Sequence, residues 1–337
     1  MTQTDTRPVA VVTGGSAGIG RATVRAFAAA GYDVAVLARG QTGLAAAVAD
    51  VQQTGRRGLG ISTDVADVDQ TESATDRIEA ELGPIQVWVN CAFAGSLAFF
   101  WDTTPAEYER MTAVTYYGQV NGTRAALRVM RARDRGAIVN VSSAMAYRAI
   151  PLQSAYCGAK HAIKGFTESV LTELIATKSG VTIGLVTLPG VNTTQFSWNL
   201  NKMPGHPRPV PPIVQPEVCA RSILFSAQHP RRNMWVGLST AYTVLGNRVA
   251  PSVVDWYLAK TGVKSQQTHD ELPRWGSNVF QAQDAEADRG ARGSFDSTAA
   301  EHDPVSFVAR NRIASLAAAG TTVAAAAIAA TRHLRRR

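Results

Sequence analysis

Apolar, mostly β-branched runs alternate with longer segments of helical period along the first 240 positions of the chain. This alternation is typical of a parallel sheet with helices on both faces, whose strands are apolar because both sheet faces are buried. The runs predict strands over residues 9–13, 33–38, 59–63, 85–90, 137–142, 181–187 and 234–237. The periodic segments predict five helices. The first ends at about residue 30, the second begins near residue 41, the third ends near residue 82, and the last two span about 105–133 and 154–178. We therefore expect a doubly wound α/β fold of about seven strands.

The pattern changes beyond residue 190. Six prolines crowd residues 203–216 and predict a stiff, irregular loop, because proline fixes φ and removes a hydrogen-bond donor. Residues 264–303 are rich in Gln, Asp, Gly and Ser and only weakly periodic, which favours a flexible linker. The chain is thus expected to divide into a main domain (1–262), a linker (263–303) and a helical extension with a basic tip (304–337).

Composition fits one large domain with a full core, since the chain has 337 residues and 45% of them are hydrophobic. Of the net charge of +8, six charges come from arginines in residues 310–337. The body is therefore nearly neutral and unlike a nucleic-acid-binding domain.

Cys91, Cys157 and Cys219 show neither paired nor metal-ligand spacing, which predicts reduced thiols and no metal. No apolar stretch precedes the first strand, so we expect no secretory signal and a cytoplasmic location.

An alanine-rich, uncharged stretch at residues 313–331 is about long enough to span a bilayer. Ser315, Thr321 and Thr322 interrupt it, and few large apolar side chains would supply insertion energy. The arginines at the end of the chain would suit a helix that lies on an anionic lipid surface. A soluble alanine-rich helix is the favoured interpretation, and membrane association through residues 313–337 is the alternative.

A glycine-rich turn, Thr-Gly-Gly-Ser-Ala-Gly-Ile-Gly, separates the first predicted strand from the first helix. Gly14, Gly18 and Gly20 allow a tight turn and a close approach of the backbone to a pyrophosphate, and the helix N-terminus presents free N–H groups to that anion. A tight turn alone would also need glycines, but strand, turn and helix occur here in the order of dinucleotide-binding folds. We therefore predict a Rossmann-type cofactor site in the main domain, which includes Ser16 and Ile19.

The end of the second predicted strand indicates which dinucleotide binds. An acid there would accept hydrogen bonds from the adenosine ribose and repel a 2′-phosphate, whereas this chain has Arg39. A guanidinium can pair with a phosphate through two hydrogen bonds, which favours NADP over NAD. An ordinary exposed arginine is the alternative. Asp64, just after the third strand, is expected either to contact the adenine amino group or to cap a helix.

A serine, a tyrosine and a lysine form the candidate catalytic set. Ser143 closes the fifth strand, Tyr156 follows thirteen positions later, and Lys160 lies four positions beyond, on the same helical face. The ordinary pKa of tyrosine is about 10, and a nearby ammonium lowers it. Tyr156 would then exchange a proton with an alcohol or carbonyl, Ser143 would hold the same oxygen, and hydride would pass between substrate carbon and nicotinamide. A Tyr-x-x-x-Lys pair alone is more often a surface pair, so the serine and the glycine turn carry the prediction.

With these residues, the chain resembles the short-chain dehydrogenase/reductase family over roughly residues 7–240. The other positions that the resemblance assigns to the cofactor are Asp64, Val65, Asn90, Ala92, Pro189, Gly190, Val191 and Thr193. It implies that Pro189, Val191 and Thr193 contact the nicotinamide end and that Lys160 also binds the nicotinamide ribose. It further implies a homo-oligomer, commonly formed in this family through the helices near 105–133 and 154–178.

Two positions depart from the family pattern. The family commonly has Asn-Asn-Ala-Gly after the fourth strand, whereas this chain has Asn-Cys-Ala-Phe, which places the bulk of Phe93 beside the cofactor. Many members also carry an asparagine that anchors a water in a proton relay to the lysine, and Thr115 stands at that position. Threonine is expected either to hold this water through its hydroxyl or to imply slower turnover or a rerouted proton path.

Bulky apolar side chains follow the fourth and sixth predicted strands. They are Phe99, Phe100, Trp101, Phe196, Trp198, Leu200 and Met203. Such bulk suits a small lipophilic or aromatic carbonyl or alcohol, although core or oligomer packing would explain any one of them equally well. The sequence therefore predicts an NADP(H)-dependent oxidoreductase that interconverts an alcohol and a ketone or aldehyde. A non-catalytic nucleotide-binding sensor or scaffold, and an epimerase or dehydratase on the same fold, are the alternatives.

Overall fold

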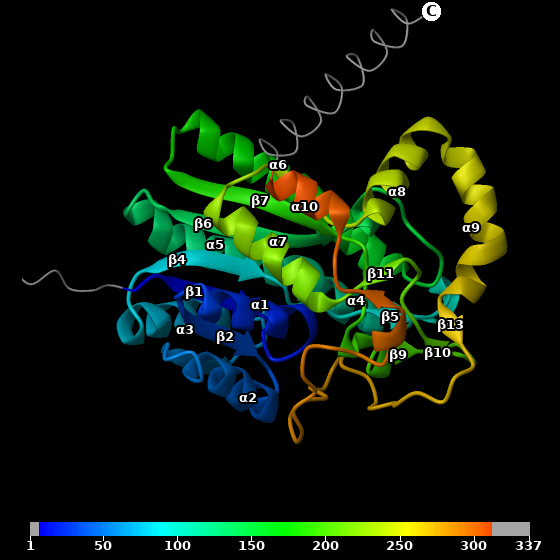
Figure 1. Ribbon diagram of the computed structural model, residues 1–337, viewed down its shortest axis with the longest axis horizontal. Coiled ribbons are helices and arrows are strands. Elements are labelled where there is room, and N and C mark those ends of the chain that lie inside the picture. The colour runs from blue at the N-terminus through cyan, green and yellow to red at the C-terminus, as the bar shows by residue number, and fades with distance from the viewer. Residues whose placement is uncertain (1–6, 312–337) are drawn as a thin grey trace, which may run out of the picture.

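Seven parallel strands form one central sheet in the computed structural model, which describes residues 7–311 (Figure 1). The strands are β1 (Val9–Thr13), β2 (Asp33–Ala38), β3 (Gly58–Ser62), β4 (Ile85–Asn90), β6 (Gly136–Ser143), β7 (Val181–Leu188) and β12 (Asn233–Trp235). Their order in the sheet is β12-β7-β6-β4-β1-β2-β3. The chain therefore reverses its direction of winding between β1 and β4, and ligands of such sheets bind at this point, beyond the carboxyl ends of the strands. The predicted doubly wound fold is confirmed.

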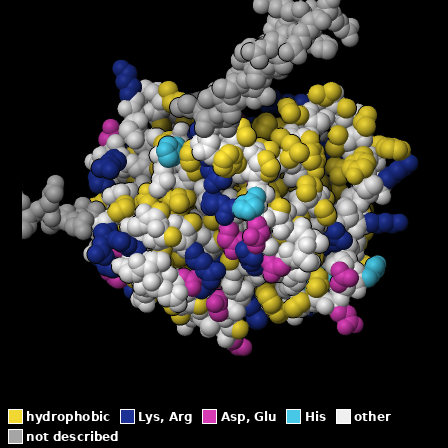
Figure 2. Space-filling model, viewed as in Figure 1, with side chains coloured by type: hydrophobic (Ala, Val, Ile, Leu, Met, Phe, Trp, Pro, Cys, Tyr) yellow, Lys and Arg dark blue, Asp and Glu magenta, His cyan; other side chains and the backbone are white. Residues whose placement is uncertain are grey.

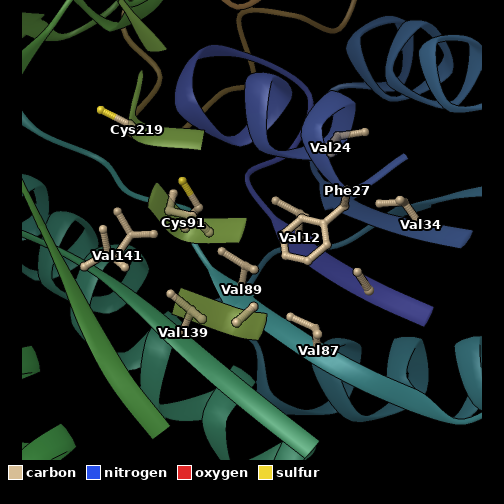
Figure 3. Close-up of a cluster of buried hydrophobic side chains, with 14 of the residues drawn as sticks. Val12, Val24, Phe27, Val34, Val87, Val89, Cys91, Val139, Val141 and Cys219 are labelled. Carbon is tan, nitrogen blue, oxygen red and sulfur yellow. The ribbon is translucent and has the colours of Figure 1, made fainter. Parts of the chain in front are cut away.

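Two layers of helices cover the sheet. One face carries α1 (Gly18–Ala29), α2 (Gln41–Gln52) and α7 (Pro216–Gln228), and the other carries α3 (Val68–Glu81), α5 (Gly118–Ala132) and α6 (Ser154–Ala176). Each layer has its own core, because side chains of the apolar strands point alternately to the two faces. Figure 3 shows Val24 and Phe27 of α1 packed against valines of the first face, among them Val12 and Val34. These two cores fix the strand ends that carry the site.

The predicted helix over 105–133 is divided into two. It consists of α4 (Pro105–Thr112), a π-helical turn (Ala113–Tyr117) and α5. Thr104 begins α4 with a capping box, in which its hydroxyl accepts from the backbone of Glu107 and the Glu107 carboxylate accepts from the backbone of Thr104. π-Helical turns are rare and occur mostly as single interruptions within α-helices, frequently at functional sites.

Residues 263–303 lie against the main domain, so the structure differs from the expected flexible linker. The helices α8 (Leu238–Val249) and α9 (Pro251–Ser265) lead into this part of the chain. Its two short strands pair with strands of the proline-rich loop region. They are β13 (Gln267–Thr268), which pairs with β10 (His206–Pro207), and β14 (Ala299–Ala300), which pairs with β11 (Ile213–Val214). Hydrogen bonds between loops, rather than a periodic apolar face, hold this region, which explains why the sequence pattern did not reveal it.

Three further short strands and one helix complete the described chain. They are β5 (Ser96–Leu97), β8 (Gly190–Val191), β9 (Leu200–Asn201) and α10 (Pro304–Arg310). The alanine-rich stretch and its basic tip, residues 313–337, lie outside the described residues, as does the predicted choice between a soluble helix and a membrane anchor. Over residues 7–311, no helix combines the length and the apolar character needed to cross a membrane.

Candidate active site

One pocket extends along the carboxyl ends of the central strands and collects nearly all of the predicted site residues. Those that line it are Gly14, Ser16, Gly18, Ile19, Gly20, Arg39, Asp64, Val65, Ala92, Ser143, Tyr156, Lys160, Pro189, Gly190, Val191 and Thr193. They come from the ends of β1, β2, β3, β4, β6 and β7 or the loops that follow these strands, from the first turn of α1 and from the first two turns of α6. The pocket therefore lies where the winding of the sheet reverses, as expected for a doubly wound fold.

Asn90 is the exception among the predicted residues, since it is fully buried and does not line the pocket. Its amide donates to Oδ1 of Asn140 at 2.8 Å and to the hydroxyl of Thr123 at 3.1 Å, and its Oδ1 accepts from the indole of Trp88. This network ties the end of β4 and the middle of β6 to α5. The structure thus places Asn90 as a support beneath the pocket.

The glycine turn leaves room that a side chain would fill. A Cβ on Gly20 would lie 2.1 Å from the carbonyl oxygen of Gly14, and a Cβ on Gly14, which has φ 66°, would lie 2.7 Å from Cα of Ala92. Ala17 precedes α1 without a side-chain cap. The N–H of Gly18 donates to the carbonyl oxygen of Gly290 at 3.0 Å, and the N–H groups that follow it in the first turn have no side-chain partner. These features fit the pyrophosphate of a dinucleotide.

The nicotinamide end has a donor without a partner. The hydroxyl of Thr193 is buried, lines the pocket and has no hydrogen-bond partner among the described residues. A buried polar group in this state favours a ligand with a complementary amide or hydroxyl. The residues present therefore fit a nicotinamide dinucleotide at both the phosphate end and the carboxamide end.

At the adenosine end, Arg39 and Asp64 both have protein partners. The guanidinium of Arg39 donates to the carbonyl oxygens of Val279 at 3.4 Å and Phe280 at 3.1 Å, and also to that of Asn278. Burial, followed by the positive charge of Arg110, lowers the pKa of Arg39. The carbonyls therefore occupy much of the hydrogen-bonding capacity that the sequence analysis assigned to a phosphate.

Asp64 does not cap the helix that follows it. Its carboxylate accepts from the guanidinium of Arg110 and from the backbone of Ala66, whereas Asp67 is the N-cap of α3 and accepts from the backbone of Gln70 at 3.0 Å. Of the two alternatives for Asp64, the capping role thus belongs to Asp67. Asp64 remains on the pocket wall, where an adenine contact stays a prediction.

Ser143, Tyr156 and Lys160 meet in the middle of the pocket. The Lys160 ammonium lies 5.4 Å from the ring centre of Tyr156 and donates to the carbonyl oxygen of Val141 at 2.7 Å. Burial raises the pKa of Tyr156 far above its ordinary value, and a hydrogen bond with Ser143 acts in the opposite direction. Burial also lowers the pKa of Lys160 to about 8. Burial therefore dominates the pKa of Tyr156 in this structure, and the expected lowering of that pKa by Lys160 stays a prediction.

Thr115 lies in the π-helical turn, and its hydroxyl makes two hydrogen bonds within the protein. It accepts from the backbone N–H of Ala94 at 3.0 Å and donates to the carbonyl oxygen of the same residue at 2.9 Å. The side chain is fully buried and is not part of the pocket lining. Thr115 therefore fixes the loop after β4 to the turn, and its hydroxyl has no donor left for a water in a proton relay.

Comparison with known proteins assigns the fold and the site to one family. Residues 8–205 match the family described as "short chain dehydrogenase", which covers more than half of the chain. The chain belongs to the short-chain dehydrogenase family. Its oxidoreductase character and its use of a nicotinamide nucleotide follow from this membership.

Individual relatives agree with the assignment. The chain is 30% identical over 288 residues to an uncharacterized oxidoreductase, YxnA, of Bacillus subtilis, a match over 84% of this chain and 80% of the relative. It is 34% identical over 224 residues to an acetoacetyl-CoA reductase of Paracoccus denitrificans, over 65% of this chain and 90% of that protein. A solved short-chain dehydrogenase of Streptomyces avermitilis superposes with a TM-score of 0.63 at 26% identity, over 77% of this chain and 99% of its own.

Some of the predicted aromatic residues line the pocket of this short-chain dehydrogenase. Phe196 and Trp198 line the pocket, and Phe93 does so with its ring 5.8 Å from that of Tyr156. Phe100 and Trp101, by contrast, are 64% and 76% exposed and lie outside the lining. Phe99, Leu200 and Met203 also lie outside the lining. Lining residues that the sequence analysis missed include Met145, Ile150 and Tyr242.

A second group of missed residues comes from the end of the chain. Asn278, Ala282, Gln283 and Asp284 line the pocket at the adenosine end. No motif or periodicity marks them, because the contacts that place them are hydrogen bonds to loops far away in the sequence, such as that of Arg39 with Phe280. The short-chain dehydrogenase site is thus completed by residues beyond the part that matches the family, 8–205.

Proposed function

We propose that this short-chain dehydrogenase interconverts an alcohol and a ketone or aldehyde and uses NADP(H) as the hydride carrier. The observation that carries the proposal is one pocket that holds Ser143, Tyr156 and Lys160 together with the glycine turn. The bound nicotinamide would donate or accept the hydride at the substrate carbon. The cofactor contacts expected from the sequence, from the glycine turn to Thr193, belong to the same proposal.

The protein's own groups would handle the oxygen and its proton. The hydroxyl of Ser143 holds the substrate oxygen, and the hydroxyl of Tyr156 transfers the proton. Because burial raises the pKa of Tyr156, this side chain is protonated at neutral pH, which is the form that donates a proton to a carbonyl oxygen. Lys160 remains charged below its pKa of about 8 and stabilises the tyrosinate that forms.

Arg39 supports NADP(H) as the form of the cofactor. It lies on the pocket wall just after β2, where the 2′-position of the adenosine ribose is expected in this fold. Its charge attracts a phosphate even while its N–H groups donate to carbonyl oxygens, and a phosphate would compete for those donors.

The lining supports a small lipophilic or aromatic substrate. Phe93 lies beside Tyr156, and Phe196, Trp198 and Ile150 add further apolar surface to the pocket lining. A site with few polar groups orients its ligand through them and gains affinity from apolar contact. A cytoplasmic homo-oligomer is part of the proposal, supported by family membership and by three free, buried cysteines.

The test is the turnover of a panel of lipophilic ketones, aldehydes and alcohols with NADP(H), compared between wild type and Tyr156→Phe. Removing the transferable proton should lower kcat by about 10²- to 10⁴-fold while cofactor binding is retained. Tyr108→Phe, which changes a tyrosine outside the pocket lining, is the control and should turn over like wild type. Unchanged turnover in Tyr156→Phe would refute the mechanism.

A further inference from the structure

Residues 275–296, here called the C-terminal segment, run along the cofactor pocket and touch its three parts. At the substrate end, the backbone N–H of Trp275 donates to the carbonyl oxygen of Ser197 at 2.7 Å. At the glycine turn, Gly18 donates to the carbonyl oxygen of Gly290 at 3.0 Å. Beside the nicotinamide end, the backbone of Phe295 donates to the side chain of Asn192 at 3.0 Å. The segment is therefore part of the pocket wall rather than a neighbour of it.

Asp284 is the acid that this segment brings to the adenosine end. The residue as a whole is 6% exposed, and it lines the pocket. A Cβ on Gly40 would lie 1.9 Å from Oδ1 of Asp284, and a Cβ on Gly43 would lie 2.4 Å from Oδ2. The backbone N–H of Gly43 also donates to the Asp284 carbonyl oxygen at 3.0 Å. The carboxylate therefore sits in a notch that only glycines permit, at the beginning of α2 and next to Ser16.

The Asp284 carboxylate differs from the other acids of this segment in its partners. Asp288 accepts from the guanidinium of Arg21 at 3.0 Å, and Asp296 accepts from the amides of Asn192 and Gln215 at 2.9 Å. Within residues 7–311, by contrast, no hydrogen bond or ion pair reaches the side-chain oxygens of Asp284. The carboxylate of this pocket-lining residue is therefore available to a ligand that brings hydrogen-bond donors.

Asp284 supplies an acidic side chain where β2 ends without one. Cofactor sites that bind NAD(H) place an acid at the adenosine ribose, whereas this chain has Ala38 and Arg39 after β2. Asp284 comes within reach of the same place from the far end of the chain, flanked by Ser16 of the glycine turn and Gly40. The negative charge also acts on Arg39, whose pKa it shifts upward against the effect of burial.

We propose that Asp284 is a specificity-determining residue for the cofactor. Its carboxylate accepts hydrogen bonds from the ribose hydroxyls of NAD(H) and repels the 2′-phosphate of NADP(H), so it opposes Arg39 at the same end of the pocket. The preference of the wild-type protein for NADP(H) or NAD(H) then depends on the balance between the positive charge of Arg39 and the negative charge of Asp284, which the C-terminal segment supplies. This inference rests on the proposed nicotinamide site but not on the proposed substrate or catalytic residues.

The test is the binding of NAD⁺ and NADP⁺ to the full chain, measured by isothermal titration calorimetry. Asp284→Asn keeps the shape and removes the charge, and should shift the Kd ratio in favour of NADP⁺ by about tenfold, the effect of one charge-assisted hydrogen bond. Asp288→Asn makes the same change in the same segment outside the pocket lining, and should shift the ratio by less than about twofold. Arg39→Met should shift it in the opposite direction, towards NAD⁺.

Two outcomes overturn the proposal: an unchanged ratio in Asp284→Asn, or an equal shift in Asp288→Asn, which would indicate a general loosening of the segment. Asp284→Ser provides a second uncharged variant with the same expected shift. Titration with 2′,5′-ADP and 5′-ADP isolates the adenosine end and should reproduce the shift. The outcomes separate the two proposals, because absent binding of either dinucleotide would refute the cofactor site, whereas binding with an unshifted ratio would refute only the role of Asp284.

Discussion

Arg21 and Arg25 donate to the same carboxylate oxygen of Asp50 but differ in burial, which makes them a matched pair for a stability experiment. The side chain of Arg21 is 2% exposed, and it also pairs with Asp288 at 3.0 Å and with the carbonyl oxygen of Ser16 at 3.1 Å. That of Arg25 is 47% exposed. Arg21 thus links α1 to α2, to the glycine turn and to the C-terminal segment, whereas the side chain of Arg25 forms its hydrogen bond with α2 alone.

The expected cost follows from these contacts. Removing one partner of a buried ion pair costs about 3–5 kcal/mol, because the remaining charge stays desolvated. In Arg21→Met, Asp50 keeps Arg25 and the 40% exposed Asp288 can be hydrated, so the lower value, about 3 kcal/mol, applies. Arg25→Met breaks an exposed pair and should cost about 0.5 kcal/mol.

Urea unfolding followed by tryptophan fluorescence measures the difference. With a slope of about 3 kcal/mol per molar urea, the midpoint should fall by about 1 M in Arg21→Met and by about 0.2 M in Arg25→Met. Methionine preserves most of the side-chain volume, so the comparison reports the lost charge rather than a cavity. Equal midpoint shifts in the two variants would show that burial does not set the contribution of Arg21.

Two further predictions concern the site. Thr115→Val leaves the backbone N–H and carbonyl of Ala94 without their partner and should lower the free energy of unfolding by about 2 kcal/mol. Thr115→Ser keeps both hydrogen bonds and loses only a buried methyl group, so it should cost about 1 kcal/mol, and equal urea midpoints for the two variants would contradict the contact. Lys160 loses its charge as the pH rises through about 8, so kcat for carbonyl reduction should fall above that pH, and a pH–rate profile that stays level to pH 9.5 would contradict this role.

The sequence was sufficient for the central sheet, because each strand is a continuous apolar run between turn residues. β2 and β4 have the bounds predicted from such runs, Asp33–Ala38 and Ile85–Asn90. Family motifs also located the pocket, since the glycine turn, Ser143 and Tyr156 come together at the strand ends. Spacing alone, however, did not reveal that burial would dominate the pKa of Tyr156.

The C-terminal segment could not be predicted in the same way. Only Val279 and Ala291 among its apolar residues are fully buried, so it has no periodic apolar face. Its position depends on single hydrogen bonds to distant loops, and neither partner of such a bond signals the other in the sequence. For this reason the partners of Arg39 and the position of Asp284 emerge only from the fold.

The attachment of the C-terminal segment has a consequence for the order of folding. The ion pair between Arg21 and Asp288 joins residues 267 positions apart, and contacts of such long sequence separation close slowly because the loop entropy must be overcome first. During synthesis, the sheet and its glycine turn leave the ribosome long before Asp284. A nascent chain therefore passes through a stage in which the nucleotide groove exists without its adenosine-side wall, and the complete site is among the last parts of the molecule to form.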